Sequence, residues 1–242
     1  MDLNRRALLS FMSALPVFGA ASAVAAQRTP SATEGPYYPS AKMRFSDADN
    51  NLVRITGAVR AAGGEVIVLK GRVLDSAGTP LNGARVEIWQ CDVNGIYLHT
   101  RDRSRGGYDD AFQGFGHVVT GPDGAYAFRT IKPTVYPGRT PHIHVKAFAG
   151  GRELTTQFYL ADHPLNDRDR IYRRLGAAER ELVTMRFVGG PDGPEATVDI
   201  LLEAGRRYLW TAADWRPSPM SSSASAKKPL VWREVQKPST SP

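Results

Sequence analysis

Residues 136–144, Tyr-Pro-Gly-Arg-Thr-Pro-His-Ile-His, carry a phenol, a guanidinium and two imidazoles within nine positions. In an extended strand, residues two apart point to the same face, so His142 and His144 aim together, about 6–7 Å apart along the chain. Such a pair forms a natural metal clip. With an oxyanion ligand it suits an oxidised iron better than a structural zinc. The alternatives are a copper or zinc centre, or a half-exposed strand with two surface histidines.

Two prolines and a glycine shape the chain that leads into these histidines. Pro137 and Pro141 restrict the backbone, and Gly138 permits a sharp turn between them. This kinked approach is predicted to bring Tyr136 back over the two imidazoles. Ile143 alternates with the histidines and is expected to face a hydrophobic core.

Composition and charge narrow the class of protein. The chain has 242 residues, of which 42% are hydrophobic and 23% charged, as is typical of a globular protein. Its single cysteine, Cys91, excludes an intramolecular disulfide and a cysteine-based zinc site. The net charge of +7 is spread along the chain without a nucleic-acid-binding motif, so nucleic acid is not an expected partner.

The sequence divides into four segments. Residues 1–26 place Arg5 and Arg6 before an apolar run that ends in small residues, which predicts a twin-arginine signal peptide. We therefore expect export to the periplasm or the exterior, with no stable membrane association after cleavage; an uncleaved anchor or an ordinary secretion signal is the alternative. An N-terminal arm (27–64), a β-sandwich (65–216) and a mobile or surface-wrapping tail (217–242) follow.

Short apolar segments separated by Gly- and Pro-rich turns predict an all-β sandwich with long loops and little helix. Val86 and Ile88 are predicted to share one face of their strand, opposite Trp89. One helical region is expected within residues 162–181. The predicted strands cover residues 65–75, 84–90, 117–120, 125–130, 142–149, 153–160, 182–188 and 195–203.

Aromatic residues outside the histidine strand are candidates for the same site. Tyr37 lies in a proline-bounded segment, and Trp89 ends a predicted strand. Each is interpreted either as a wall of a substrate pocket or as a packing residue. Tyr108 lies in a glycine-flanked loop of a length usually associated with function, and we favour it over Tyr97 as a second phenolic ligand.

Taken in order along the chain, these segments resemble the intradiol ring-cleavage dioxygenases, in particular the protocatechuate 3,4-dioxygenase type. The strand-turn pattern of residues 71–88 also occurs in transthyretin-like (prealbumin-like) binding modules. The resemblance covers roughly residues 33–203. It is carried by residues 33–39 (Thr-Glu-Gly-Pro-Tyr-Tyr-Pro), 83–90 (Gly-Ala-Arg-Val-Glu-Ile-Trp-Gln), the Tyr108 loop, 128–133 (Phe-Arg-Thr-Ile-Lys-Pro), 136–144 and 156–159 (Thr-Gln-Phe-Tyr).

The resemblance implies a non-haem Fe(III) enzyme of aromatic compound catabolism. It implies that both atoms of O2 enter a catechol-type diol, giving a cis,cis-muconate-type diacid. The implied metal ligands are Tyr108, Tyr136, His142 and His144.

The resemblance also assigns roles beside the metal. Tyr136 would accept a proton from the substrate, Arg139 would stabilise negative charge on the ring, and Gln157 would orient Arg139 or the substrate. A plain surface cation is the alternative for Arg139. Because all four implied ligands lie in one chain, no partner chain is required, and a homo-oligomer is compatible with the sequence. The rival function is an exported transthyretin-like binding module without turnover.

Overall fold

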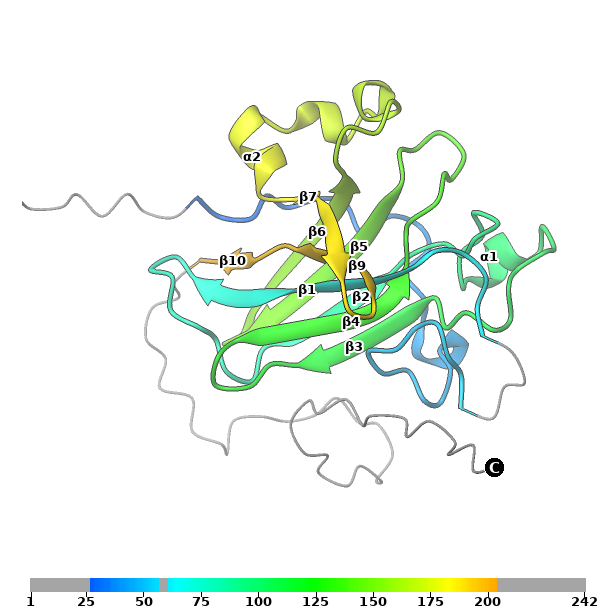
Figure 1. The fold of residues 1–242 in the computed structure, drawn as a ribbon, viewed down its shortest axis with the longest axis horizontal. Helices are drawn as coiled ribbons and strands as arrows, with labels where there is room; N and C mark the ends of the chain where they lie inside the picture. The colour runs from blue at the N-terminus through cyan, green and yellow to red at the C-terminus, as the bar shows by residue number, and fades with distance from the viewer. Residues whose placement is uncertain (1–26, 57–60, 204–242) are drawn as a thin grey trace, which may run out of the picture.

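The computed structural model describes residues 27–56 and 61–203. The predicted signal peptide (1–26), the predicted tail (217–242) and residues 204–216 of the predicted sandwich lie outside the described residues. Two five-stranded sheets stack against each other in the described part, which confirms the predicted all-β sandwich (Figure 1).

The first sheet is built around its longest strand, β1. This strand pairs antiparallel with β4 over seven residue pairs, from Val66 with Ile131 to Arg72 with Ala125. It also pairs in parallel with β9 and β10, and β9 forms a hairpin with β8. The strands are β1 (Val66–Asp75), β4 (Ala125–Ile131), β8 (Phe187–Gly190), β9 (Gly193–Thr197) and β10 (Ile200–Leu202).

The second sheet carries the histidine strand at its centre. Its order is β3-β2-β5-β6-β7, so β5 is flanked by antiparallel neighbours on both sides. The predicted strand 142–149 matches β5. The strands are β2 (Arg85–Trp89), β3 (Phe115–Val119), β5 (His142–Ala149), β6 (Arg152–Leu160) and β7 (Thr184–Met185).

The core lies between the two sheets and follows the expected alternation of side chains. Val86 and Ile88 of β2 are fully buried in it, as predicted, together with Ile143 and Val145 of β5. Because residues two apart share a face, burying Ile143 and Val145 turns His142 and His144 to the opposite face of this sheet.

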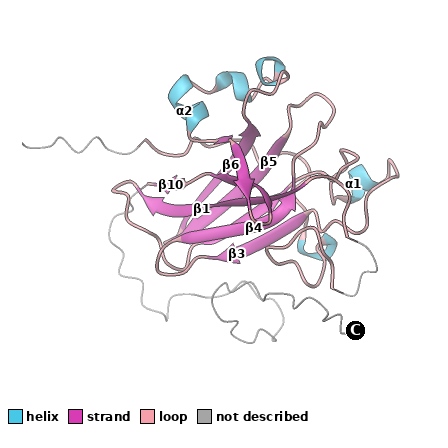
Figure 2. Cartoon of the chain, in the orientation of Figure 1, coloured by secondary structure: helices cyan, strands magenta, loops and turns pink. Residues whose placement is uncertain are grey.

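Within the described residues, helix is confined to short segments outside the two sheets (Figure 2). The helical region expected within residues 162–181 is mostly irregular, because it contains two single 3₁₀ turns before a five-residue α2. No helix in the described part of the chain has the length and hydrophobicity needed to cross a bilayer. The helical elements are η1 (Ala41–Met43), α1 (Thr100–Arg103), η2 (Asn166–Arg168), η3 (Tyr172–Arg174) and α2 (Ala177–Glu181).

His117 on β3 should make stability depend on pH. Its Nδ1 atom is buried without a hydrogen-bond partner. Burial, assisted by the nearby charge of Arg85, lowers the pKa of His117 to about 4, against about 6.5 in an unfolded chain. The unfolded chain therefore binds the extra proton first, and the free energy of unfolding should fall as pH drops from about 6.5 towards 4.

Urea unfolding of the metal-free protein at pH values of about 7.5, 6 and 5 measures the free energy of unfolding. These pH values lie on either side of the histidine pKa of about 6.5 in an unfolded chain. The free energy of unfolding of His117→Gln should fall less steeply over the same interval than that of the wild type. It should still fall to some extent, because the variant retains the other buried histidines. Equal slopes for both proteins would show that His117 does not contribute.

Candidate functional site

His142 and His144 meet on the face of β5 that points away from the core. Their Nε2 atoms lie 3.1 Å apart, and both side chains are buried. Strand pairing sets what surrounds them, because His144 lies opposite Trp89 of β2 on one side and Gln157 of β6 on the other. The sequence prediction that the two imidazoles share a face is confirmed.

The hydrogen bonds of His142 fix which ring nitrogen is free. Its Nδ1 lies 2.7 Å from the carbonyl oxygen of Thr140. A carbonyl can only accept, so Nδ1 carries the proton and Nε2 presents a lone pair. Burial, reinforced by the charge of Arg139, lowers the pKa of His142 to about 4. Burial also lowers the pKa of His144 well below its usual value, so both rings are neutral at neutral pH and could serve as metal ligands.

Trp89 holds the second imidazole flat. Its indole stacks on His144 with ring centres 4.7 Å apart and planes within 9°. The indole is fully buried. Of the two roles considered for Trp89, packing against the histidine is therefore the one that the structure shows.

Tyr97 reaches the histidines from the loop that follows β2. Its hydroxyl lies 3.4 Å from His142 Nε2, and its ring centre lies 5.9 Å from that of His144. The loop is held from within, because the Asp92 carboxylate accepts hydrogen bonds from the backbone N–H groups of Asn94 and Ile96. Burial raises the pKa of the Tyr97 phenol well above its usual value.

Tyr136 lies beside Tyr97, at the start of a tight turn that leads towards β5. Arg139 N–H donates to the Tyr136 carbonyl over 3.0 Å, and Gly138 between them has φ = 78°. Proline followed by a glycine with positive φ is the signature of a type II turn. The Tyr136 ring meets Tyr97 edge to face at 5.4 Å. Tyr136 thus packs against Tyr97, the phenol that contacts His142, while its predicted position over the two imidazoles stays a prediction.

Tyr108, which we favoured as the second phenol, lies elsewhere. Its hydroxyl donates to the Phe112 carbonyl over 2.6 Å, and its ring lies under the Arg103 guanidinium. Tyr97 occupies the place beside the histidines instead, so the geometry corrects the preference. A signal was present in the sequence: Tyr97 follows a tight Asp-Val-Asn-Gly turn at the end of the strand that pairs with the histidine strand.

The N-terminal arm closes over the same face. The Gln157 side chain donates to the Thr33 carbonyl over 2.9 Å, and Tyr37 stacks on Tyr97 with ring centres 5.1 Å apart. Tyr37 also meets Tyr136 edge to face at 5.7 Å. Gly35, at φ = 76°, passes so close that an added Cβ would lie 3.3 Å from the His144 ring. Tyr37 therefore belongs to the cluster around the histidines.

Arg139 presents its guanidinium to the site. Its Nη2 donates to Gln157 Oε1 over 2.6 Å, and its Nη1 lies 3.5 Å from His142 Nε2. The two predicted polar residues are therefore in contact. Sequence reasoning missed a third: the Arg139 Nε–H donates to Asp169 over 2.7 Å. Asp169 lies in the irregular 162–175 region, where no periodic pattern indicated its position.

The two imidazole nitrogens are spaced to hold a single metal ion. With metal–nitrogen bonds of about 2.0–2.1 Å, two nitrogens at right angles are separated by about 3 Å, close to the 3.1 Å between the two Nε2 atoms. Two imidazoles and two phenols suit an oxidised iron. Among the described residues, no cluster of three or more His, Cys, Asp or Glu side chains offers a competing centre.

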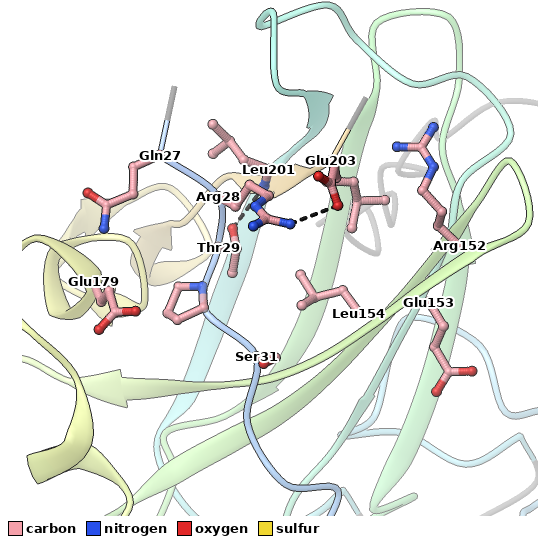
Figure 3. Close-up of a pocket in the computed structure, with 12 residues that line it drawn as sticks. Gln27, Arg28, Thr29, Ser31, Arg152, Glu153, Leu154, Glu179, Leu201 and Glu203 are labelled. Atoms are coloured by element: carbon pink, nitrogen blue, oxygen red, sulfur yellow. Dashed lines mark hydrogen bonds and ion pairs between the residues drawn. The ribbon is translucent and has the colours of Figure 1, made fainter. Parts of the chain in front are cut away.

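A separate cavity of about 500 Å³ lies at the start of β6, away from the histidines (Figure 3). The start of the arm, the first residues of β6 and the end of β10 line it, and an ion pair between Arg28 and Glu203 crosses it at 2.8 Å. None of the predicted site residues contributes to this cavity.

Comparison with known proteins gives the family. The dioxygenase family model matches residues 33–204. The protocatechuate 3,4-dioxygenase beta chain of Burkholderia cepacia is 39% identical over 51% of this chain and 57% of its own length. The hydroxyquinol 1,2-dioxygenase of Nocardioides simplex is 33% identical over 58% of this chain and 55% of its own length. This chain thus spans little more than half the length of either relative.

A solved structure agrees over its whole length. The dioxygenase domain of a dioxygenase carbohydrate-binding protein fusion from Streptomyces sp. SirexAA-E superposes with a TM-score of 0.55 and 33% identity. The match covers 74% of this chain and 100% of that domain. With the family model, the named relatives and this fold in agreement, the chain belongs to the intradiol ring-cleavage dioxygenase family.

Proposed function

We propose that the protein is a non-haem Fe(III)-dependent intradiol dioxygenase that acts on a catechol-type diol. The observation that carries the proposal is the convergence of two neutral imidazoles and the Tyr97 phenol, with Tyr136 packed against Tyr97. The proposed iron ligands are Tyr97, Tyr136, His142 and His144. Tyr97 replaces Tyr108 in the set implied by the sequence.

The iron would supply a Lewis acid that makes a bound catechol dianion reactive towards O2. Binding a catechol as a dianion requires that two protons be removed; the protein offers a base for one of them, and the other would pass to water. Tyr136 is more exposed than Tyr97 and lies at the start of its turn. Burial and a hydrogen bond with Tyr37 raise the pKa of Tyr136, so its phenolate would readily take a proton from an entering diol.

Arg139 and Gln157 then act on charge and orientation. The Arg139 Nη1 atom is directed at the histidines, where a fixed cation stabilises negative charge that develops on the substrate ring. Gln157 holds Nη2 of this guanidinium and is itself held by the Tyr159 hydroxyl, which donates to Oε1 over 2.8 Å. In the overall reaction, both O2 atoms enter the diol, the bond between its two oxygenated carbons breaks, and a cis,cis-muconate-type diacid forms.

Iron analysis, visible spectroscopy and O2 uptake together test this proposal. The purified chain should contain about one iron per molecule and show a red-brown band from phenolate-to-Fe(III) charge transfer. A panel of catechols should give O2 uptake and the ultraviolet spectrum of a diacid. Iron-free, colourless protein that binds diols without turnover would favour a binding module. Copper or zinc in place of iron, or extradiol cleavage products, would also contradict the proposal.

A further inference from the structure

Asp169 is a buried carboxylate that contacts the site from outside the sheet. Its Oδ2 accepts from Arg139 Nε over 2.7 Å and from the Thr140 backbone N–H over 3.0 Å. Its Oδ1 accepts from the backbone N–H groups of Ile171 and Tyr172 over 2.8 and 2.9 Å. These hydrogen bonds lower the pKa of Asp169 although burial opposes them. The residue is therefore a charged acceptor fixed by four donors.

The first consequence concerns the orientation of Arg139. Asp169 holds Nε of the guanidinium, and Gln157 holds Nη2. Two anchored atoms of a planar group fix its rotation, so Nη1 is left directed at His142 Nε2, 3.5 Å away. Without Asp169, rotation about the Arg139 side chain would be limited by Gln157 alone.

The second consequence concerns His142. Asp169 holds the N–H of Thr140, and the carbonyl of the same residue accepts the Nδ1 proton of His142 over 2.7 Å. That proton determines which nitrogen His142 presents to the site. The Asp169 carboxylate thus holds Arg139, and it also holds Thr140, the residue that fixes the tautomer of His142.

We propose that Asp169 is a positioning residue of the catalytic site, acting through Arg139 and Thr140 rather than by touching substrate. This role rests on the proposed dioxygenase function. It gives the irregular segment between β6 and β7 a task in catalysis, since Asp169 joins that segment to the start of β5. The competing explanation is that Asp169 merely stabilises the turn at Ile171 and Tyr172.

Asp169→Asn separates these explanations. An asparagine keeps an oxygen for the Ile171 and Tyr172 N–H groups, but it turns an NH2 group towards two donors, Arg139 Nε–H and Thr140 N–H. In the iron-loaded full chain, we expect kcat to fall about 10–100-fold with KM changed far less. The matched control, Asp167→Asn, makes the same change at an exposed position two residues away and should leave kcat unchanged. An unchanged kcat in folded Asp169→Asn would overturn the proposal.

A double-mutant cycle tests the route through Arg139. In an Arg139→Ala background, Asp169→Asn should lower kcat by a clearly smaller factor than in the wild-type background, because the Arg139 part of its role is already absent and only the route through Thr140 remains. Full multiplication of the two losses would show that Asp169 acts independently of Arg139. If Asp169→Asn does not fold, Asp169→Glu serves instead. Asp169→Glu keeps the charge but displaces it, so kcat should fall by less than the loss expected for Asp169→Asn. A kcat equal to that of the wild type would overturn the proposal.

A metal-free measurement keeps this inference distinct from the proposed function. In 15N-labelled apo-protein, the Arg139 Nε–H signal should be protected from exchange in the wild type and Asp167→Asn, and unprotected in Asp169→Asn. An unprotected wild-type signal would contradict the positioning role. Wild-type protein without diol turnover, but with a protected Arg139 signal, would instead refute the dioxygenase proposal and leave the ion pair established.

Discussion

Tyr97→Phe is expected to lower kcat at least about 100-fold and to weaken or shift the visible charge-transfer band. The reason is geometric: the lost oxygen is the one that lies 3.4 Å from His142 Nε2 in the buried site. Replacing the phenol with a phenyl ring preserves the stacking with Tyr37 and removes a single donor atom. Absorption spectra and steady-state O2 uptake measure both effects.

Tyr108→Phe is the matched control, since it makes the same chemical change in the neighbouring loop. The Tyr108 hydroxyl donates a hydrogen bond to the Phe112 carbonyl, so its removal should leave the charge-transfer band and kcat close to wild type. If Tyr108→Phe abolished the band while Tyr97→Phe preserved it, the sequence-based preference for Tyr108 would be reinstated and the ligand set proposed here would be wrong.

Arg139→Lys should lower kcat by about 100-fold although the positive charge is retained. A lysine ammonium is a point charge on a flexible stem and cannot reproduce the planar group that joins Asp169, Gln157 and the histidine face. Iron content should stay near wild type, because Arg139 is not a ligand. Steady-state kinetics and metal analysis on the same preparation measure the two quantities.

Arg186→Lys provides the comparison for this substitution. Arg186 is exposed and pairs with Glu181 at the surface, so its conversion should leave kcat unchanged. Arg139→Lys with wild-type kcat would show that the guanidinium shape is unimportant, and Arg139 would then be an ordinary cation near the site.

The sequence was most informative where side-chain alternation governs the structure. The strand over residues 142–149, the opposed faces of Ile143 and the two histidines, and the turn at Gly138 all follow from local rules of strand and turn geometry. These features arise within a few residues of one another. Local rules were therefore sufficient to predict them.

The choice between Tyr97 and Tyr108 depends on long-range pairing. The pairing of Trp89 with His144 determines which phenol lies beside the histidines, because this pairing brings the loop after β2 to them. Both loops contain glycine and tyrosine, and composition does not distinguish them. Asp169 was hidden for a similar reason, since its four donors come from two segments separated by β5 and β6.

The two ends of the described chain lie next to each other, at the end of the sandwich remote from the histidines. Thr29 N–H donates to the Leu201 carbonyl over 3.2 Å, and Leu201 N–H donates to the Thr29 hydroxyl over 2.8 Å (Figure 3). These residues border Arg152 and Leu154, at the opposite end of the β5–β6 hairpin from Gln157. The described part of the chain therefore has the neighbouring ends that circular permutation requires, and an exposed turn such as Ala77–Gly78 offers a place for new termini.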